Sequence, residues 1–228
     1  MPTYLIIGAS RGIGGGTAAH LAETGAEVLS VSRSPSSVGT WIEADVGSVK
    51  GIETVKAAVG NRPLDGLLFL GGVWEKGAFT DEYSFLDSPV EETLNMIAVN
   101  LTAPILLAQG LAKNLSETPN PRIILMGSMS GVQNTASPEV ANTAAKFGLQ
   151  GAGEALNLSL RKLGIATTLI NPDYVATPEV VEEIAAGDMG DQAPIPMGDM
   201  TRTIDYVLNL SGDSVPLVIN LRQAKPGE

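Results

Sequence analysis

The stretch Leu5-Ile6-Ile7-Gly8-Ala9-Ser10-Arg11-Gly12-Ile13-Gly14 decides the fold. An apolar run, Tyr4–Ile7, leads into glycines spaced G-x-x-x-G-x-G, and a helical pattern follows over Gly14–Glu23. Glycines at a strand-to-helix turn let the backbone approach a pyrophosphate, whose charge is met by N–H groups at the start of the helix. The sequence therefore predicts a dinucleotide-binding turn, and the alternative is a glycine turn without a ligand.

Short apolar runs alternate with longer periodic stretches along the whole chain. The runs are mostly continuous, as expected for strands covered on both faces: Tyr4–Ile7, Glu27–Val31, Gly66–Leu70, Arg122–Met126, Ala166–Ile170 and Val215–Ile219. The stretches with helical periodicity are Gly14–Glu23, Val49–Val59, Val90–Leu111 and Glu139–Leu163. This alternation predicts an α/β fold, a doubly wound parallel sheet in three layers, formed by one domain over residues 1–228.

Residues 177–199 differ from the rest of the chain because they are rich in Glu, Asp, Gly, Pro and Met. We interpret them as a short helix inside a mobile loop, a lid over the substrate, although an ordinary solvated loop has the same composition. Its apolar residues predict an apolar ligand surface unless they only pack on the core: Val180, Val181, Ile184, Met189, Ile195 and Met197. The acidic ones would discourage anionic substrates: Glu179, Glu182, Glu183, Asp188 and Asp191. A helix is expected next, over Thr201–Leu210, with Asp199 as its N-cap.

Composition narrows the function. The chain of 228 residues has no cysteine and a single histidine, His20, so thiol chemistry and a Ser-His-Asp triad are excluded, and we expect no metal site. Lys and Arg number 14 against 25 Asp and Glu, and the net charge of −11 argues against nucleic acid or an anionic membrane as partner. No apolar run approaches a membrane span, and the N-terminus lacks a signal-peptide pattern, so we expect a cytoplasmic protein.

Further motifs follow in a fixed order: Ala44-Asp45-Val46, Asn100, Ser128, Lys146, Asn171-Pro172 and Thr177-Pro178. Together with the glycine loop, they make the chain resemble the short-chain dehydrogenase/reductase family over essentially its whole length. The resemblance implies a nicotinamide cofactor. The residues expected at that cofactor are Gly8, Ser10, Arg11, Gly12, Ile13, Gly14, Arg33, Asp45, Val46, Gly71, Gly72, Lys146, Pro172 and Thr177.

The choice of cofactor follows from charge. In family members that prefer NAD, an acidic residue at the end of the second strand holds the ribose 2′-hydroxyl, whereas the strand here ends Val31-Ser32-Arg33-Ser34. A guanidinium suits a 2′-phosphate, and Arg11 can approach the same group from the other side, so NADP(H) is favoured over NAD(H). The alternative is two solvated arginines. By resemblance, Asp45 accepts from the adenine amino group, although it can also cap the helix near Val49.

The resemblance also implies an Asn-Ser-Tyr-Lys set that reduces a carbonyl. Asn100 matches the asparagine, Ser128 the serine and Lys146 the lysine. Four residues before Lys146, where the family's tyrosine shares a helix face with the lysine, stands Asn142. A carboxamide can donate a hydrogen bond but is not a general acid near neutral pH. We therefore expect Ser128 and Asn142 to hold the substrate oxygen while the proton comes from elsewhere.

The replacement for the missing phenol is left open among three sources: Tyr174, a relay through Lys146, or a bound water. Tyr174 stands just past the strand Ala166–Ile170, on the side of the sheet where ligands bind, although it can simply pack under the nicotinamide. The neighbouring Asp173 would place a carboxylate near the carboxamide end of the cofactor, and Thr177 can bond that carboxamide.

Two functions from different classes fit these residues. The first is an NADP(H)-dependent oxidoreductase acting on a carbonyl or alcohol of a small, apolar substrate, and the second is an inert NADP(H)-binding sensor or scaffold. A lyase or isomerase that reuses the pocket is a third. The helices around Asn100 and Lys146 carry apolar and small residues on more than one face, so a homodimer or homotetramer is expected. His20 is expected to be a surface or helix-packing residue.

Overall fold

The computed structural model describes residues 1–187 and 192–224. Seven strands form one parallel sheet: β1 Thr3–Ile7, β2 Glu27–Ser32, β3 Thr40–Glu43, β4 Gly66–Phe69, β5 Arg122–Met126, β6 Ala166–Pro172 and β7 Val218–Leu221. Their order across the sheet is β3-β2-β1-β4-β5-β6-β7. The first three strands extend the sheet to one side of β1 and the later ones extend it to the other, beginning with β4. The predicted doubly wound α/β fold is confirmed. The last strand lies three residues later than predicted, and β3 was not among the apolar runs because it is short and half exposed.

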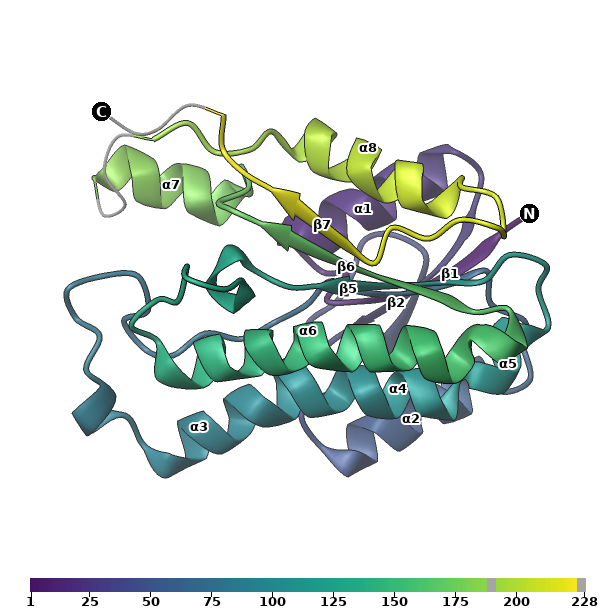
Figure 1. The fold of residues 1–228 in the computed structure, drawn as a ribbon, viewed down its shortest axis with the longest axis horizontal. Coiled ribbons are helices and arrows are strands. Elements are labelled where there is room, and N and C mark those ends of the chain that lie inside the picture. The colour runs from purple at the N-terminus through teal and green to yellow at the C-terminus, as the bar shows by residue number, and fades with distance from the viewer. Residues whose placement is uncertain (188–191, 225–228) are drawn as a thin grey trace.

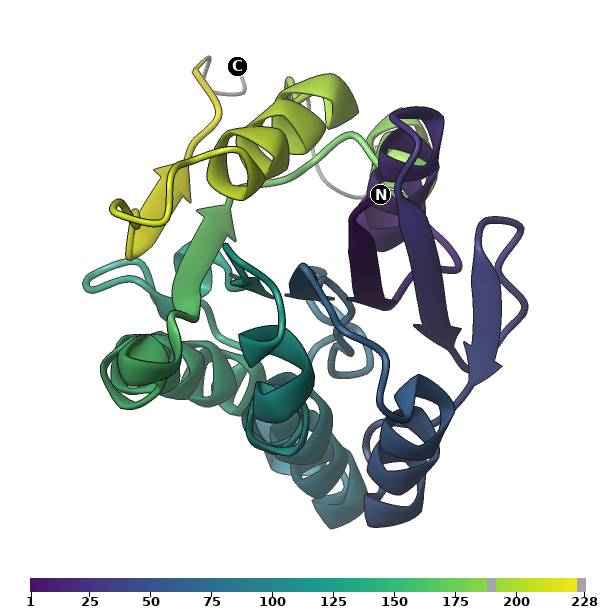
Figure 2. The same ribbon diagram turned by 90° about the vertical axis from the view of Figure 1, so that its right-hand side faces the viewer.

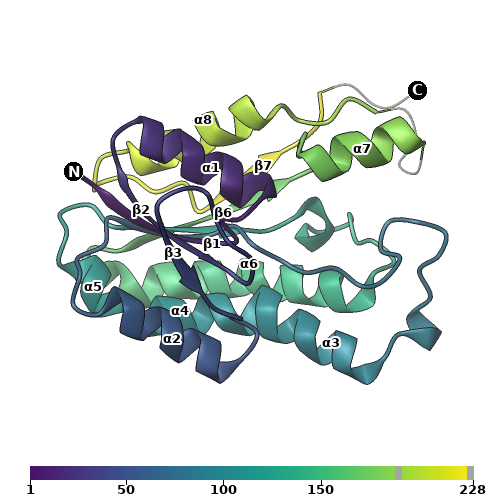
Figure 3. The same cartoon turned by 180° about the vertical axis from the view of Figure 1, so that it is seen from behind.

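Helices cover both faces of the sheet (Figures 1 and 2). The α-helices are α1 Gly12–Glu23, α2 Val49–Val59, α3 Val90–Ile97, α4 Ala103–Gly110, α5 Ala112–Ser116, α6 Val140–Leu160, α7 Pro178–Ala186 and α8 Met197–Leu208. Short 3-10 turns lie at Phe85–Asp87, Met129–Gly131 and Arg161–Leu163. One face carries α1 and α8, and the other carries α2, α4 and α6; Figure 3 shows α2 beneath the β3 edge.

Two apolar cores hold the layers together, one on each side of the sheet. Side chains alternate between faces along each strand, so Leu5 and Ile7 of β1 point to the α2–α4–α6 side while Ile6 points to the α1–α8 side. All three are at most 2% exposed. The strands are thus buried on both faces, as their unbroken apolar runs predicted.

The predicted helix Val90–Leu111 is not continuous. It is interrupted by a π-helical turn over Ala98–Thr102, which separates α3 from α4. Pro104 explains the break, because it has no N–H to donate to the carbonyl of Asn100 four residues earlier. The turn therefore falls on a residue expected in the active site.

The same helical stretch corrects a second expectation. Val90–Gly110 spans 21 residues with a mean hydropathy of 1.2, which is long and apolar enough to cross a membrane by length and composition. In this fold its α3 part packs on α6 and its α4 part on α2, where Ala103 and Leu107 join the core. It is accordingly a helix of the layer that covers the sheet.

The predicted N-cap of α8, Asp199, is wrong, and of the two roles left open for Asp45 the capping of α2 belongs to Ser48. Helix α2 is capped by Ser48, whose Oγ accepts from the Gly51 N–H at 3.0 Å, while Asp45 accepts from Gly47 N–H at 3.1 Å and braces the preceding turn. Helix α8 begins at Met197, earlier than predicted. Asp199 therefore lies inside its first turn, where its carboxylate pairs with Arg202.

Candidate active site

The carboxyl ends of the strands all point to the side of α7, at the left of Figure 1, and the expected site residues gather at this edge. The glycine loop leaves β1 there. Gly8 has a φ of +86°, and its N–H donates to Val31 O of β2 at 2.8 Å. A Cβ on Gly8 would lie 2.3 Å from Gly71 Cα, and one on Gly14 would lie 2.2 Å from Gly8 O. The loop and Gly71 thus form a cradle that only glycine backbone can line.

Helix α1 starts directly behind this cradle. Arg11 is its cap residue, the first turn contains no acidic side chain, and Ile13 packs on the core. Backbone N–H groups at a helix N-terminus attract anions, and no carboxylate of the first turn opposes one here. Ser10 lies in the turn, and Gly12 takes a φ of +56°. The residues present therefore fit the diphosphate of a dinucleotide.

Charged side chains flank the loop. Arg33 follows β2, is exposed and forms no ion pair in the described part of the chain. Arg11 is instead paired with Glu179 of α7, with 3.6 Å between Nε and Oε1. Asp45 is exposed after β3, and Val46 packs on the core beside it. Arg33 is thus the cation with a free guanidinium at this edge.

Asn100 fixes the chain that follows β4. Its Oδ1 accepts from Val73 N–H at 3.0 Å, and its Nδ2 donates to Val73 O at 2.9 Å. The side chain is 2% exposed, and the π-helical turn carries it. A Cβ on Gly72 would lie 3.3 Å from Asn100 Oδ1 and 3.9 Å from Lys146 Nζ. Asn100 thus sets the position of the segment Gly72-Val73-Trp74 beside Lys146.

The structure brings Ser128 and Asn142 together through Ser130. Ser130 Oγ donates to Ser128 Oγ at 2.9 Å, and Asn142 Nδ2 donates to Ser130 Oγ at 3.4 Å. Asn142 is fully buried, and its Oδ1 has no hydrogen-bond partner within residues 1–187 and 192–224. Asn171 of β6 accepts from Ser128 N–H at 3.1 Å and so holds the serine in place. Sequence reasoning assigned no role to Ser130 or Asn171.

Lys146 lies one helical turn after Asn142 and is 4% exposed. Its Nζ donates to Met126 O at 2.9 Å, at the end of β5, and lies 5.7 Å from the ring centroid of Trp74. Burial lowers the pKa of Lys146 to about 8, because the ammonium is removed from water. In the described part of the chain it forms no ion pair that would oppose this effect.

Tyr174 is placed differently. Its ring meets Phe79 edge to face at a centroid distance of 6.1 Å, and Phe79 meets Trp74 in the same way at 5.2 Å. Burial, and then the carboxylates of Glu139, Asp173 and Glu183, raise the pKa of Tyr174. Such a phenol releases its proton less readily than a free one, which is the opposite of what the missing acid requires.

Two buried glutamates clamp the loop after β4 to the start of α6. Glu75 accepts from Asn142 N–H at 2.8 Å, and Glu139 accepts from Phe79 N–H at 2.8 Å, where Phe79 has a φ of +66°. Each carboxyl keeps a second oxygen that is buried and has no partner in the part of the chain that the structure describes. The clamp fixes the wall formed by Trp74 and Phe79. No sequence pattern marks these glutamates, because each bonds a backbone group at least 60 residues away.

At the end of β6, the Asp173 carboxylate is held by the C-terminal segment. Its Oδ2 accepts from Gln223 N–H at 3.1 Å and pairs with Arg222 at 3.4 Å. Pro172 is the last residue of β6. Thr177 caps α7 through a bond from Val180 N–H at 3.4 Å. Its Cγ2 lies 3.8 Å from the position of a Cβ on Gly12, so this threonine borders the glycine loop.

Part of the segment predicted to be a lid packs on the core of the protein. The short helix is confirmed as α7, where Val181 is exposed and Val180 and Ile184 are partly exposed. Ile195, in contrast, bonds backbone groups of Tyr174 and Ala176 and is buried, and Met197 packs on the same core. These two residues line the core rather than a ligand. The expectations for Asp188, Met189 and Asp191 lie outside the described residues.

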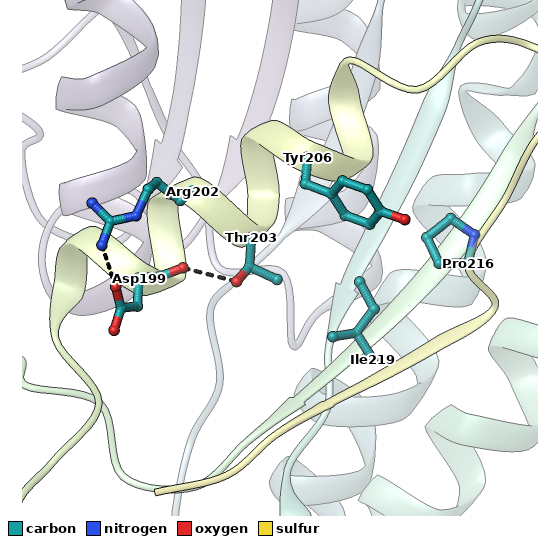
Figure 4. A pocket seen from close by; sticks show the side chains of 6 residues that line it. All are labelled: Asp199, Arg202, Thr203, Tyr206, Pro216 and Ile219. Atoms are coloured by element: carbon teal, nitrogen blue, oxygen red, sulfur yellow. Dashed lines mark hydrogen bonds and ion pairs between the residues drawn. The ribbon is translucent and has the colours of Figure 1, made fainter. Parts of the chain in front are cut away.

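Two cavities lie away from most of these residues. A shallow pocket of about 520 Å³ lies on the outer side of α8 and β7 (Figure 4), and its lining residues are Asp199, Arg202, Thr203, Tyr206, Pro216 and Ile219. A second one, of about 140 Å³, reaches Glu75 from between α3 and α6. His20 pairs with Asp205 at 2.5 Å and joins α1 to α8, as expected for a helix-packing residue.

A parallel sheet with a glycine cradle, an anion-accepting helix start and a buried lysine at its carboxyl edge defines a dinucleotide-binding α/β protein. The model of the short chain dehydrogenase family matches residues 2–187, and the chain belongs to that family. Membership makes it an oxidoreductase with a nicotinamide cofactor.

Relatives and solved structures agree with this membership. The chain is 30% identical over 200 residues to the short chain dehydrogenase ausX of Penicillium brasilianum, covering 83% of this chain and 74% of the relative. It is 25% identical over 215 residues to the 3-oxoacyl-[acyl-carrier-protein] reductase FabG of Vibrio cholerae, covering 84% and 85%. A short chain dehydrogenase family protein from Francisella tularensis has the same fold, with a TM-score of 0.83 at 20% identity and 98% of each chain covered.

Proposed function

We propose that the chain is an NADP(H)-dependent oxidoreductase that interconverts a carbonyl and an alcohol on a small, apolar substrate. The observation that carries the proposal is the grouping of Ser128, Asn142 and Lys146 at the sheet edge from which the glycine loop also leaves. When bound, the nicotinamide supplies or accepts the hydride. The protein's own contribution is to bind, to orient and to handle the proton.

The preference for NADP(H) rests on Arg33. Its guanidinium is exposed and forms no ion pair in the described residues, and no acidic side chain stands in the segment Val31-Ser32-Arg33-Ser34. A guanidinium binds a phosphate through two parallel hydrogen bonds. A metagenomic short-chain oxidoreductase of 22% identity and TM-score 0.77 was solved in complex with NADP, so this fold accommodates that cofactor.

We expect Arg33→Ala to weaken NADPH binding about tenfold, because a charge-assisted hydrogen bond to the 2′-phosphate is lost. Binding of NADH, which lacks that phosphate, should change less than about twofold. Titration of the protein with each cofactor, followed by intrinsic fluorescence, measures the dissociation constants of NADPH and NADH. Arg161→Ala, at an exposed position after α6, is the matched control. Equal losses for NADPH and NADH would show that Arg33 does not read the 2′-phosphate.

The substrate oxygen is assigned to Ser128 and Asn142. The chain Ser128–Ser130–Asn142 leaves the Ser128 hydroxyl hydrogen free to donate, because Ser128 Oγ accepts from both the N–H and the hydroxyl of Ser130. Asn142 Nδ2 has only a long bond to Ser130 and can turn toward a carbonyl. These two donors polarise the carbonyl.

The test is a panel of aldehydes and ketones incubated with NADPH or NADH and followed by cofactor absorbance and product analysis. Reduction of at least one carbonyl, faster with NADPH, is the expected result. Tight NADPH binding without oxidation across the panel would instead favour an inert sensor or scaffold.

We also propose that the protein is cytoplasmic and forms a homodimer or homotetramer. Exposed apolar side chains on α3 and α6 support self-association, with Val90 70%, Leu94 64% and Phe147 40% exposed. Sedimentation analysis of the purified chain tests the oligomeric state, and a monomer at micromolar concentration would contradict it.

A further inference from the structure

A reductase that lacks a phenol beside its lysine needs another proton donor near the substrate oxygen. The acidic side chains beside or within the segment from Ser128 to Lys146 include Tyr174, Glu75, Glu139 and Lys146 itself. Glu139 accepts from Phe79 N–H at 2.8 Å and so holds the loop after β4. The contacts of these side chains in the structure differ enough to choose among them. The choice rests on the proposed function, since a proton donor is required only if a carbonyl is reduced.

Tyr174 is part of an aromatic cluster. Its ring packs against Phe79, Phe79 packs against Trp74, and Trp74 is the ring that lies 5.7 Å from Lys146 Nζ. Carboxylates of Glu139, Asp173 and Glu183 surround Tyr174 and oppose release of its proton.

Glu75 is held by the backbone of α6. One oxygen accepts from Asn142 N–H, and the residue lines the pocket between α3 and α6, whose other lining residues include Tyr83 and Ala144. That pocket contains neither Ser128 nor Lys146. The Glu75 carboxylate therefore accepts a backbone hydrogen bond at the start of α6, as a helix cap does.

Lys146 remains, and its geometry fits. It shares a helix face with Asn142 because residues four apart are neighbours. Its Nζ lies at Met126 O, two residues before Ser128, and beside the backbone of Gly72. Met126 O takes one of the three ammonium N–H bonds, which leaves two for other acceptors. The Trp74 ring covers the ammonium from the side of the loop.

We propose that Lys146 is the general acid of this enzyme and donates a proton from its ammonium to the substrate oxygen, directly or through one water. In reduction, the carbonyl carbon receives the hydride and the C=O π electrons move to oxygen. That oxygen forms an O–H bond as one N–H bond of Lys146 breaks. The lysine is left as a neutral amine and regains its proton from water, and in alcohol oxidation every step runs in reverse.

The protonation equilibrium of Lys146 supports this role. With a pKa of about 8, the side chain is protonated near neutral pH yet gives up its proton readily, which is the compromise that general acid catalysis favours. A neighbouring phenolate would stabilise the ammonium and oppose this shift. With Asn142 in that place, burial acts on Lys146 without a compensating negative charge.

The first test uses the protein without substrate. The ¹³Cε chemical shifts of labelled lysines are followed over pH, and Lys146→Arg assigns the resonance by its disappearance. We expect Lys146 to titrate near 8, about two units below the ordinary lysine value. Lys162→Arg, at an exposed position, is the control for the assignment. Titration of Lys146 at the ordinary lysine value would overturn the proposal.

The second test uses a carbonyl that the panel identifies. Reduction should be constant below pH 8 and fall tenfold per unit above it, since only the protonated amine donates. Lys146→Arg keeps the charge but does not release a proton, so we expect a loss of about 10²–10⁴-fold in the rate and no decline near pH 8. Lys162→Arg should behave as the wild type.

Failure of the donor role of Lys146 and failure of the proposed function give different results. An active wild type whose alkaline decline persists in Lys146→Arg, or a loss of the same size in Tyr174→Phe or Glu75→Gln alone, would overturn the role of Lys146 and leave the oxidoreductase in place. A panel that stays inert, despite NADPH binding and a Lys146 that titrates near 8, would overturn the proposed function and the donor role together.

Discussion

Gly14→Ala is expected to weaken dinucleotide binding at least about 100-fold and to destabilise the fold by about 1–3 kcal/mol. A Cβ at this position would lie 2.2 Å from the Gly8 carbonyl oxygen and 2.7 Å from its carbon. Both atoms are backbone, so relief requires the glycine loop itself to move away from helix α1. That movement would open the cradle in which the diphosphate is expected to lie. Calorimetric titration with NADPH and urea unfolding measure the two effects.

Gly15→Ala is the matched control. It lies on the same turn of α1, but a Cβ there would find its nearest atom at 3.4 Å, which is an ordinary contact. Alanine favours a helix over glycine by about 1 kcal/mol, so this variant should be as stable as the wild type or more stable, with NADPH affinity within about threefold. If both variants lost affinity equally, the effect would come from helix α1 in general and the close contact with Gly8 would not be its cause.

The glycine loop was predictable because its requirements are local. A strand, a glycine turn and a helix follow one another within about 20 residues, so the sequence alone indicated the cradle. What it did not indicate was the partner of Gly8. The close approach of Gly71 arises from pairing of β1 with β4, across more than 50 intervening residues.

The helix caps were hard to predict where more than one position could begin the helix. Asp45 and Ser48 are both good caps, and Ser48 prevails because it immediately precedes α2. Asp199 has the right side chain for a cap, but the chain already turns into α8 after Pro196. The periodicity of Val90–Leu111 likewise concealed the π-helical turn, although Pro104 was a visible signal for it.

The arrangement around Asn142 was beyond sequence reasoning. The spacing to Lys146 placed both residues on one helix face, but the partners of that face come from the loop after β4 and from the turn after β5. Glu75, Trp74 and Ser130 became relevant only when the fold brought these segments together. The pKa of Lys146, which depends on burial and on the absence of an ion pair among the described residues, could not be inferred before that.

Arg122 shows how a charged residue can be part of a buried strand. It is 1% exposed at the start of β5, where its Nη1 donates to Ser214 O at 2.8 Å. Its Nη2 donates to Leu210 O at 2.9 Å and to Ser211 O at 2.6 Å. Burial lowers the pKa of the guanidinium, yet these three carbonyls replace water at its two Nη atoms, while Nε has no partner among the described residues. The side chain thereby ties the segment after α8 to the middle of the sheet.

Arg122→Met should lower the free energy of unfolding by about 3 kcal/mol, because methionine fills the volume but leaves the three carbonyls without their donor. For a chain of this size, that corresponds to a melting temperature lower by about 6–12 °C. Arg62→Met is the control, since Arg62 is 40% exposed and its ion pair with Glu27, at 3.1 Å, is worth about 0–1 kcal/mol. Equal urea midpoints for the two variants would mean that water replaces the guanidinium at these carbonyls. A large difference, in contrast, would identify Arg122 as the polar anchor between β5 and the end of α8, on which the placement of β7 beside β6 depends.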